Sequence, residues 1–185
     1  MASNPAPGDL ELVRGFVNTL DLEEAREELD SPAAAAAWLA GHDLLDGDVV
    51  LSEDQLDRAR AMREAIRALL RANHEGTSAA QAASVLDAET ARAGLALRFG
   101  PDGTAHAQPS AGGFDAALGR LLLLIADAQR DGTWARLKVC ECDDCQYAFY
   151  DRSRNRSAVW CDMAVCGNRE KVRAYRRREA VHDHR

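Results

Sequence analysis

Several features that define common protein classes are missing from the sequence. No apolar run reaches about 18 residues, so we expect no membrane-spanning helix. Residues 1–5 show neither the basic nor the apolar stretch of a secretory signal, and we expect a cytoplasmic protein. Phosphate-binding and nucleophile motifs of the forms GxxxxGK(S/T), GxGxxG and GxSxG are absent, and the histidines are scattered. We therefore expect no enzyme.

Cysteine is absent from most of the chain. All five cysteines lie between Cys140 and Cys166. An odd and crowded set does not suit a disulfide framework and indicates a metal site in a reducing compartment. The composition, 46% apolar and 29% charged, is enough for a hydrophobic core and excludes a chain that is disordered throughout.

Charge is distributed unevenly along the chain. Residues 1–133 carry 11 basic and 22 acidic side chains, whereas residues 134–185 carry 12 basic and 8 acidic ones. We place the domain boundary here, between an acidic body and a basic, cysteine-bearing end. Such asymmetry suggests an anionic partner for the basic end. A solvated basic helix without a partner is the alternative.

The body is predicted to be mainly helical. Apolar residues recur at helical spacing from residue 10 onward and again in an apolar helix that begins near residue 114. Ser31-Pro32 is typical of a helix start, and Ser52 with Gln55 resembles a capping box. These signals predict helices that begin at residues 32 and 53.

One β-hairpin interrupts the helices. Residues 95–99 alternate in polarity, and a Pro-Asp-Gly turn separates them from a second strand over 104–108.

Asn18 and Asp21 adjoin apolar residues near the first helix. We interpret them as side chains that form hydrogen bonds with the backbone groups at their own helix end. A position facing a pocket is the alternative.

The cysteines form two short-spaced groups. Cys140-Glu141-Cys142-Asp143-Asp144-Cys145 is followed, after fifteen residues, by Cys161 and Cys166. Two such groups supply the four tetrahedral ligands of zinc and leave no open position, which defines a structural site. Spacing alone slightly favours Cys142 as the partner of Cys145, whereas Cys140 would mirror the second pair. From spacing, the first ligand stays open.

Secondary-structure signals around the cysteines predict a treble-clef-like finger. Short apolar segments near 137–139 and 147–150 flank the first group as strands. The second pair opens a helix over residues 163–178. The fold class expected for the chain is therefore α+β: a mainly helical N-terminal domain with a β-hairpin, and a small C-terminal zinc finger.

The C-terminal motifs resemble the CGNR zinc-finger family. The resemblance covers roughly residues 137–178 and is carried by Trp160-Cys161-Asp162-Met163-Ala164-Val165-Cys166-Gly167-Asn168-Arg169, Lys171, Tyr175-Arg176, Cys140, Cys145, Phe149-Tyr150-Asp151 and Ser153-Arg154-Asn155. It implies one zinc per chain held by Cys140, Cys145, Cys161 and Cys166. Cys142 is then an additional thiol outside the family pattern.

A weaker resemblance concerns the N-terminus. Residues 16–19, Phe-Val-Asn-Thr, resemble the opening motif of the ABATE domain, although Arg14-Gly15 replaces its usual Leu-Asp. Proteins with this domain and a CGNR finger are described as stress-induced transcription regulators. The resemblance therefore implies transcription regulation, which the charge and spacing arguments do not reach.

The helix after Cys166 is expected to present arginines to DNA. Arg169, Arg173, Arg176 and Arg177 fall within an arc of about 100°, and arginine suits both phosphate and guanine. Val165, Val172 and Tyr175 fall on a neighbouring arc and are expected to pack on the finger hairpin. The residues predicted to contact DNA are Arg154, Arg156, Arg169, Lys171, Arg173, Arg176 and Arg177. A local structural role is the alternative for Arg169.

Other functions are compatible with the sequence. The body could form a homodimer or sense a small-molecule effector, and the finger could then be an accessory to a small-molecule-binding sensor. A finger that binds RNA or a protein is a further alternative. RNA readers expose aromatic side chains for base stacking, whereas here Tyr147, Phe149, Tyr150 and Trp160 lie beside the cysteines, as expected for a finger core.

Overall fold

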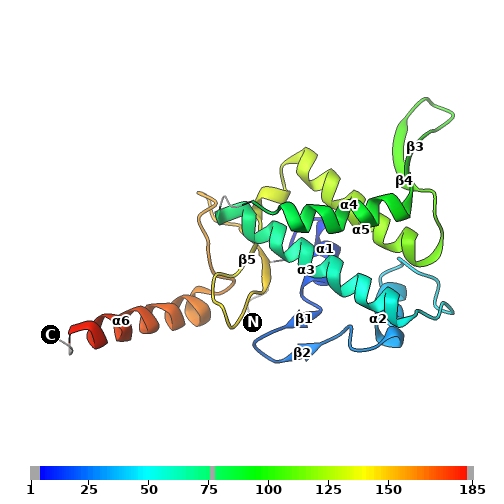
Figure 1. The fold of residues 1–185 in the computed structure, drawn as a ribbon. Coiled ribbons are helices and arrows are strands. Elements are labelled where there is room, and N and C mark those ends of the chain that lie inside the picture. Colours follow the sequence, from blue (N-terminus) through cyan, green and yellow to red (C-terminus); the bar gives the residue numbers. More distant parts are fainter. Residues whose placement is uncertain (1–4, 76–77, 183–185) are drawn as a thin grey trace.

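Six α-helices form the framework of the part of the chain that the structure describes. The computed structural model describes residues 5–75 and 78–182 (Figure 1). The helices are α1 (Leu10–Val17), α2 (Pro32–Ala40), α3 (Glu53–Glu75), α4 (Ala80–Ala93), α5 (Gly113–Asp131) and α6 (Asn168–His182). The fold is α+β with a mainly helical N-terminal part, as predicted.

Local capping explains where two helices begin. Ser31 Oγ accepts the Ala34 N–H at 3.2 Å, directly before Pro32 of α2. Ser52 and Gln55 bond reciprocally at the start of α3, with backbone N–H to side-chain oxygen distances of 2.9 and 3.3 Å. Both helix starts were predicted, because they depend on residues only three positions apart.

Within the described residues, three antiparallel strand pairs accompany the helices. They are β1 (Leu20–Asp21) with β2 (Arg26–Glu27), β3 (Leu95–Phe99) with β4 (Ala105–Pro109), and β5 (Leu137–Val139) with β6 (Ala148–Tyr150). The β3–β4 hairpin is the one predicted in the body, and β5–β6 is the one predicted in the finger. The short β1–β2 pair has only two residues in each strand and was not predicted.

The core lies among α1, α3, α4 and α5. Phe16, Met62, Ile66, Leu118 and Leu121 are fully buried there, and each such side chain stabilises the fold by about 1.5–3 kcal/mol. The same apolar cluster continues into the finger hairpin β5–β6, with α3 against β5 and α1 against β6. The body and the base of the finger therefore share one core.

Two elements extend from this core in opposite directions in Figure 1. The β3–β4 hairpin extends at one end and leaves Leu97 and Phe99 exposed at its surface. Helix α6 projects at the other end, beyond the finger. None of the helices in residues 5–75 and 78–182 has the length and apolar character needed to cross a membrane.

Candidate metal centre

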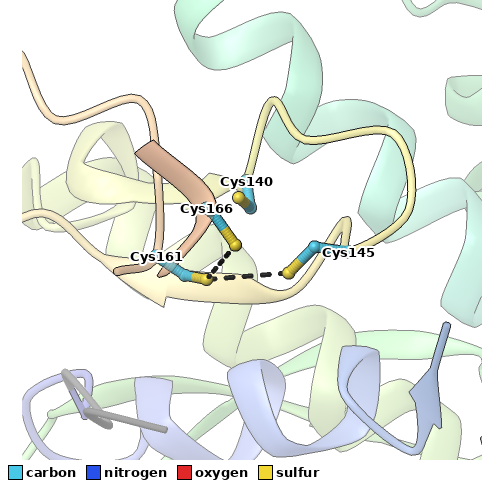
Figure 2. Close-up of side chains that lie close together, drawn as sticks. All are labelled: Cys140, Cys145, Cys161 and Cys166. Carbon is cyan, nitrogen blue, oxygen red and sulfur yellow. Dashed lines mark hydrogen bonds between the residues drawn. The ribbon is translucent and has the colours of Figure 1, made fainter. Parts of the chain in front are cut away.

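Four cysteine sulfurs converge on one point in the finger (Figure 2). The residues are Cys140, Cys145, Cys161 and Cys166, all buried, with all four Sγ atoms within 4.8 Å of one another. Cys161 Sγ lies 3.6 Å from Cys145 Sγ and 3.7 Å from Cys166 Sγ. Zinc–sulfur bonds of about 2.3 Å give a tetrahedron with edges of about 3.8 Å. The cluster therefore has the dimensions of a four-thiolate zinc site.

The electrostatics of the cluster also suit a dication. Hydrogen bonds from Cys145 and Cys161 lower the pKa of Cys140. Hydrogen bonding to Cys140 raises the pKa of Cys161, and burial raises that of Cys166. Neighbouring thiolates repel one another, and a bound Zn²⁺ removes this repulsion by binding all four as anions. The donor set thus fits one structural zinc.

Short local structures place the four sulfurs. Cys140 follows β5, and the turn to Cys145 closes through a Cys145 N–H bond to the Cys142 carbonyl at 2.9 Å. Asp162 caps the single π-helical turn Met163–Gly167 by accepting the N–H groups of residues 164 and 165 at 2.7 and 3.3 Å. This turn carries Cys166 into the cluster and leads directly into α6.

The glycine and asparagine of the CGNR motif have structural positions. A Cβ added to Gly167 would lie 2.5 Å from Met163 Sδ and 3.3 Å from Trp160 Cε3. Asn168 Nδ2 donates to the Ala164 carbonyl at 3.0 Å. Both residues therefore shape the turn that starts α6.

Cys142 lies outside the cluster, although spacing alone slightly favoured it as a ligand. It is fully buried, and its sulfur is 3.8 Å from Arg169 Nη1 and 4.0 Å from Arg173 Nη1. The cysteine that completes the cluster is Cys140, as the family resemblance implied. Because Cys140 and Cys145 are five residues apart, the chain between them forms a turn, and Cys142 lies in this turn without joining the cluster.

Asn18 joins the body to the finger. Its side-chain amide donates to the Ala148 carbonyl at 2.9 Å and accepts the Ala148 N–H at 2.7 Å, and Asn18 is buried. The interpretation of Asn18 as a side chain that satisfies its own helix end was therefore wrong. The amide instead pairs with the backbone of β6, because the end of α1 packs against that strand.

Replacing Asn18 by alanine is expected to lower the free energy of unfolding by about 1–3 kcal/mol, because the buried Ala148 N–H loses its acceptor. Urea denaturation would measure the change. Ser84→Ala is the matched control, since Ser84 makes an exposed hydrogen bond on α4 and should stay within about 0.5 kcal/mol of the unmodified protein. Equal stability of the Asn18→Ala and control proteins would contradict this role.

A buried ion pair fixes the loop between the two cysteine groups. Lys138 Nζ donates to Asp151 Oδ2 at 2.7 Å, and both side chains are almost fully buried. The same ammonium group donates to the carbonyl oxygens of Arg156 and Ala158 at 2.6 and 3.1 Å. Asp151 also accepts the N–H of Ser153 at 2.9 Å. The buried Lys138 and Asp151 side chains thus hold in place the loop that carries Arg154 and Arg156, two of the residues predicted to contact DNA.

The seven residues predicted to contact DNA fall into two groups. Five of them are exposed: Arg154, Arg156, Lys171, Arg176 and Arg177. Arg169 instead forms an ion pair with Glu23 in the β1–β2 turn of the body, and Arg173 forms ion pairs with Asp144 and Glu170. The side chains of Arg169 and Arg173 remain 29% and 37% exposed. Contact of any of the seven with DNA stays a prediction.

The apolar arc of the C-terminal helix is exposed. Val165, Val172 and Tyr175 are 41%, 49% and 56% exposed, so the expectation that they pack on the finger hairpin was wrong. Helix α6 leaves the finger after its first turn and projects outward (Figure 1). The hairpin is therefore out of reach for most of the helix.

The body contains an open groove between α3 and α4. Its volume is about 400 Å³, and alanine side chains form most of its wall. Glu64 at this wall is already bonded to Arg63 and Arg67. Binding of a small-molecule effector by the body stays a prediction, and this groove is a candidate site for it.

A helical body joined to a four-cysteine finger defines a two-part zinc-finger protein. Residues 10–131 match the ABATE family, described as "Putative stress-induced transcription regulator", and residues 136–179 match the CGNR zinc finger. The chain therefore belongs to the ABATE family and carries a CGNR zinc finger at its C-terminal end. Neither description names an enzymatic activity. A search of curated proteins found no match to the sequence.

Proposed function

We propose that the protein is a zinc-dependent DNA-binding transcription regulator. The finger, residues 134–185, holds a basic helix and a basic loop for DNA, and the body, residues 1–133, serves dimerisation or sensing. One observation carries this proposal. The four-thiol centre fixes the first turn of α6, and the rest of that helix projects with Lys171, Arg176 and Arg177 exposed.

Charge distribution supports DNA as the partner of this end. The body has twice as many acidic as basic residues, so a polyanion is repelled there and attracted to the finger. Arg154 and Arg156 add two exposed cations on the anchored loop. The role in transcription rests on the family description.

Burial of the finger aromatics favours DNA over RNA. Phe149 and Tyr150 are 2% and 9% exposed, and Trp160 packs against the cysteine cluster. Proteins that read single-stranded RNA stack exposed aromatic rings on the bases. These three rings instead belong to the core of the finger or the body.

The proposed homodimer has a candidate surface in the body. The exposed side chains of Leu97 and Phe99 lie on the β3–β4 hairpin, away from the finger. Light scattering of the full chain would give the oligomeric state. A Leu97→Ser, Phe99→Ser protein that remained dimeric would exclude the hairpin as the interface.

The DNA-binding proposal is tested by the salt dependence of affinity. Each phosphate contact contributes about 0.9 to the slope of log affinity against log salt concentration. Lys171→Ala with Arg176→Ala is therefore expected to reduce the slope by about 2. Fluorescence anisotropy with a labelled random duplex would measure it, using the full zinc-loaded chain.

Arg130→Ala is the matched control for charge removal. The Arg130 side chain is 79% exposed, but it lies on α5 in the body. We expect its loss to leave the slope unchanged. A wild-type slope in the Lys171, Arg176 double variant would remove these residues from the DNA interface, and the absence of any duplex binding would overturn the proposed function.

A further inference from the structure

Helix α6 has an inner face that is occupied by ion pairs. Arg169 forms an ion pair with Glu23 of the body. Arg173 forms ion pairs with Asp144, in the turn between Cys140 and Cys145, and with Glu170 of its own helix. These contacts hold the first turns of α6 in a fixed orientation relative to the finger and the body. A face held in this way is poorly placed to enter a DNA groove.

The outer face of α6 carries a different set of side chains. At 100° per residue, Lys171, Val172, Tyr175 and Arg176 fall within an arc of about 140°. All four are exposed, with Val172 and Tyr175 at 49% and 56%. Val172 and Tyr175 thus lie between a lysine on one side and an arginine on the other, and the exposed Glu179 falls in the same arc one turn further along the helix.

This pattern is complementary to the DNA major groove. The groove is about 12 Å wide, admits an α-helix and has phosphates along both walls, and the thymine methyl group is an apolar feature on its floor. Cations at the two edges of the outer face would meet the walls, while Val172 and Tyr175 would meet the floor. A protein partner would not require cations on both sides of the apolar strip.

We propose that α6 enters the major groove with this outer face, and that Val172 and Tyr175 recognise thymine methyl groups. This inference rests on the proposed DNA-binding function and names the surface and the base feature that it uses. Arg169 and Arg173 act as positioning residues that set the angle of the helix. The Tyr175 hydroxyl bonds Glu179 Oε1, which holds the ring along the helix and ends the apolar strip.

The test removes only the methyl group from the DNA. A duplex selected for tight binding to the full zinc-loaded chain is synthesised again with deoxyuridine at each thymidine position in turn. Burial of one methyl group corresponds to about a fourfold change in affinity. We expect the unmodified protein to lose about fourfold at one or two positions.

Val172→Ala provides the second arm of a double-mutant cycle. This variant should bind the thymidine duplex about fourfold more weakly than the unmodified protein and should no longer distinguish it from the deoxyuridine duplex at the affected position. Val50→Ala is the control, because Val50 is 90% exposed but lies in the body. Zinc content and circular dichroism confirm that both variants are folded.

The outcomes separate the inference from the function on which it rests. Tight duplex binding with equal affinity for thymidine and deoxyuridine overturns the thymine contact and leaves DNA binding intact. A Val172→Ala protein that keeps the full thymidine preference, or that loses self-association instead, overturns the assignment of this face. No binding to any duplex overturns the proposed function together with the inference.

Discussion

Removal of zinc is expected to unfold the finger and release α6. Structural zinc sites of this kind bind with apparent free energies of about 10–16 kcal/mol, and that energy maintains the local fold. The finger has a small second core, made of its cysteines with Phe149 and Trp160. Chelation should therefore lower the helical circular dichroism signal and abolish duplex binding, and added zinc should restore both.

Single cysteine substitutions test which cysteines bind the zinc. Purified protein should contain about one zinc per chain, and Cys140→Ser should contain far less, because serine supplies no thiolate. Cys142→Ser is the matched control, with a buried sulfur two residues away that is outside the cluster. Full zinc content in Cys140→Ser together with loss in Cys142→Ser would show that the ligands are misassigned.

Replacing Asp151 by alanine is expected to lower the free energy of unfolding by about 3–5 kcal/mol. The substitution leaves the Lys138 ammonium group buried without its counter-ion, and breaking a buried pair in this way has that cost. Thermal and urea denaturation would measure the loss. Asp127→Ala is the control, since Asp127 forms an exposed ion pair on α5 and should change stability by less than about 1 kcal/mol.

The same pair gives a pH dependence with a defined sign. Burial acts to raise the pKa of Asp151, but hydrogen bonds from Lys138 and Ser153 outweigh it and hold the pKa below its usual value. Its stabilising effect is therefore complete above the unfolded-state pKa, near 3.9, and is lost as pH falls through the folded value. Asp151→Asn should flatten the loss of stability below about pH 4. An unchanged acid profile would contradict this.

Short-range features of the fold could be predicted from the sequence. The helix starts at Ser31 and Ser52 depend on residues three positions away, and the β3–β4 hairpin depends on one turn and its alternating flanks. A four-cysteine zinc site could also be predicted, because zinc restricts the spacing of its ligands along the chain. Physical reasoning on spacing nevertheless left the first ligand open, and family resemblance was needed to choose Cys140.

Long-range partners could not be predicted. Asn18 pairs with Ala148, 130 positions further along the chain, and Arg169 pairs with Glu23 across the junction of body and finger. Polar residues of this kind carry no periodic signal, and many partners are available to each of them. The exposure of Val172 has a related cause, because helical spacing identifies an apolar arc but not whether anything covers it.

The shared core at the base of the finger has a consequence for protein engineering. Leu137, Val139 and Ala148 bury their side chains in the same apolar cluster as the body helices, and Asn18 completes the hydrogen bonding of β6. A finger excised at the boundary between the two matched families would expose this surface. Chimeras that exchange fingers between relatives should therefore transplant the complementary α1 and α3 positions along with them.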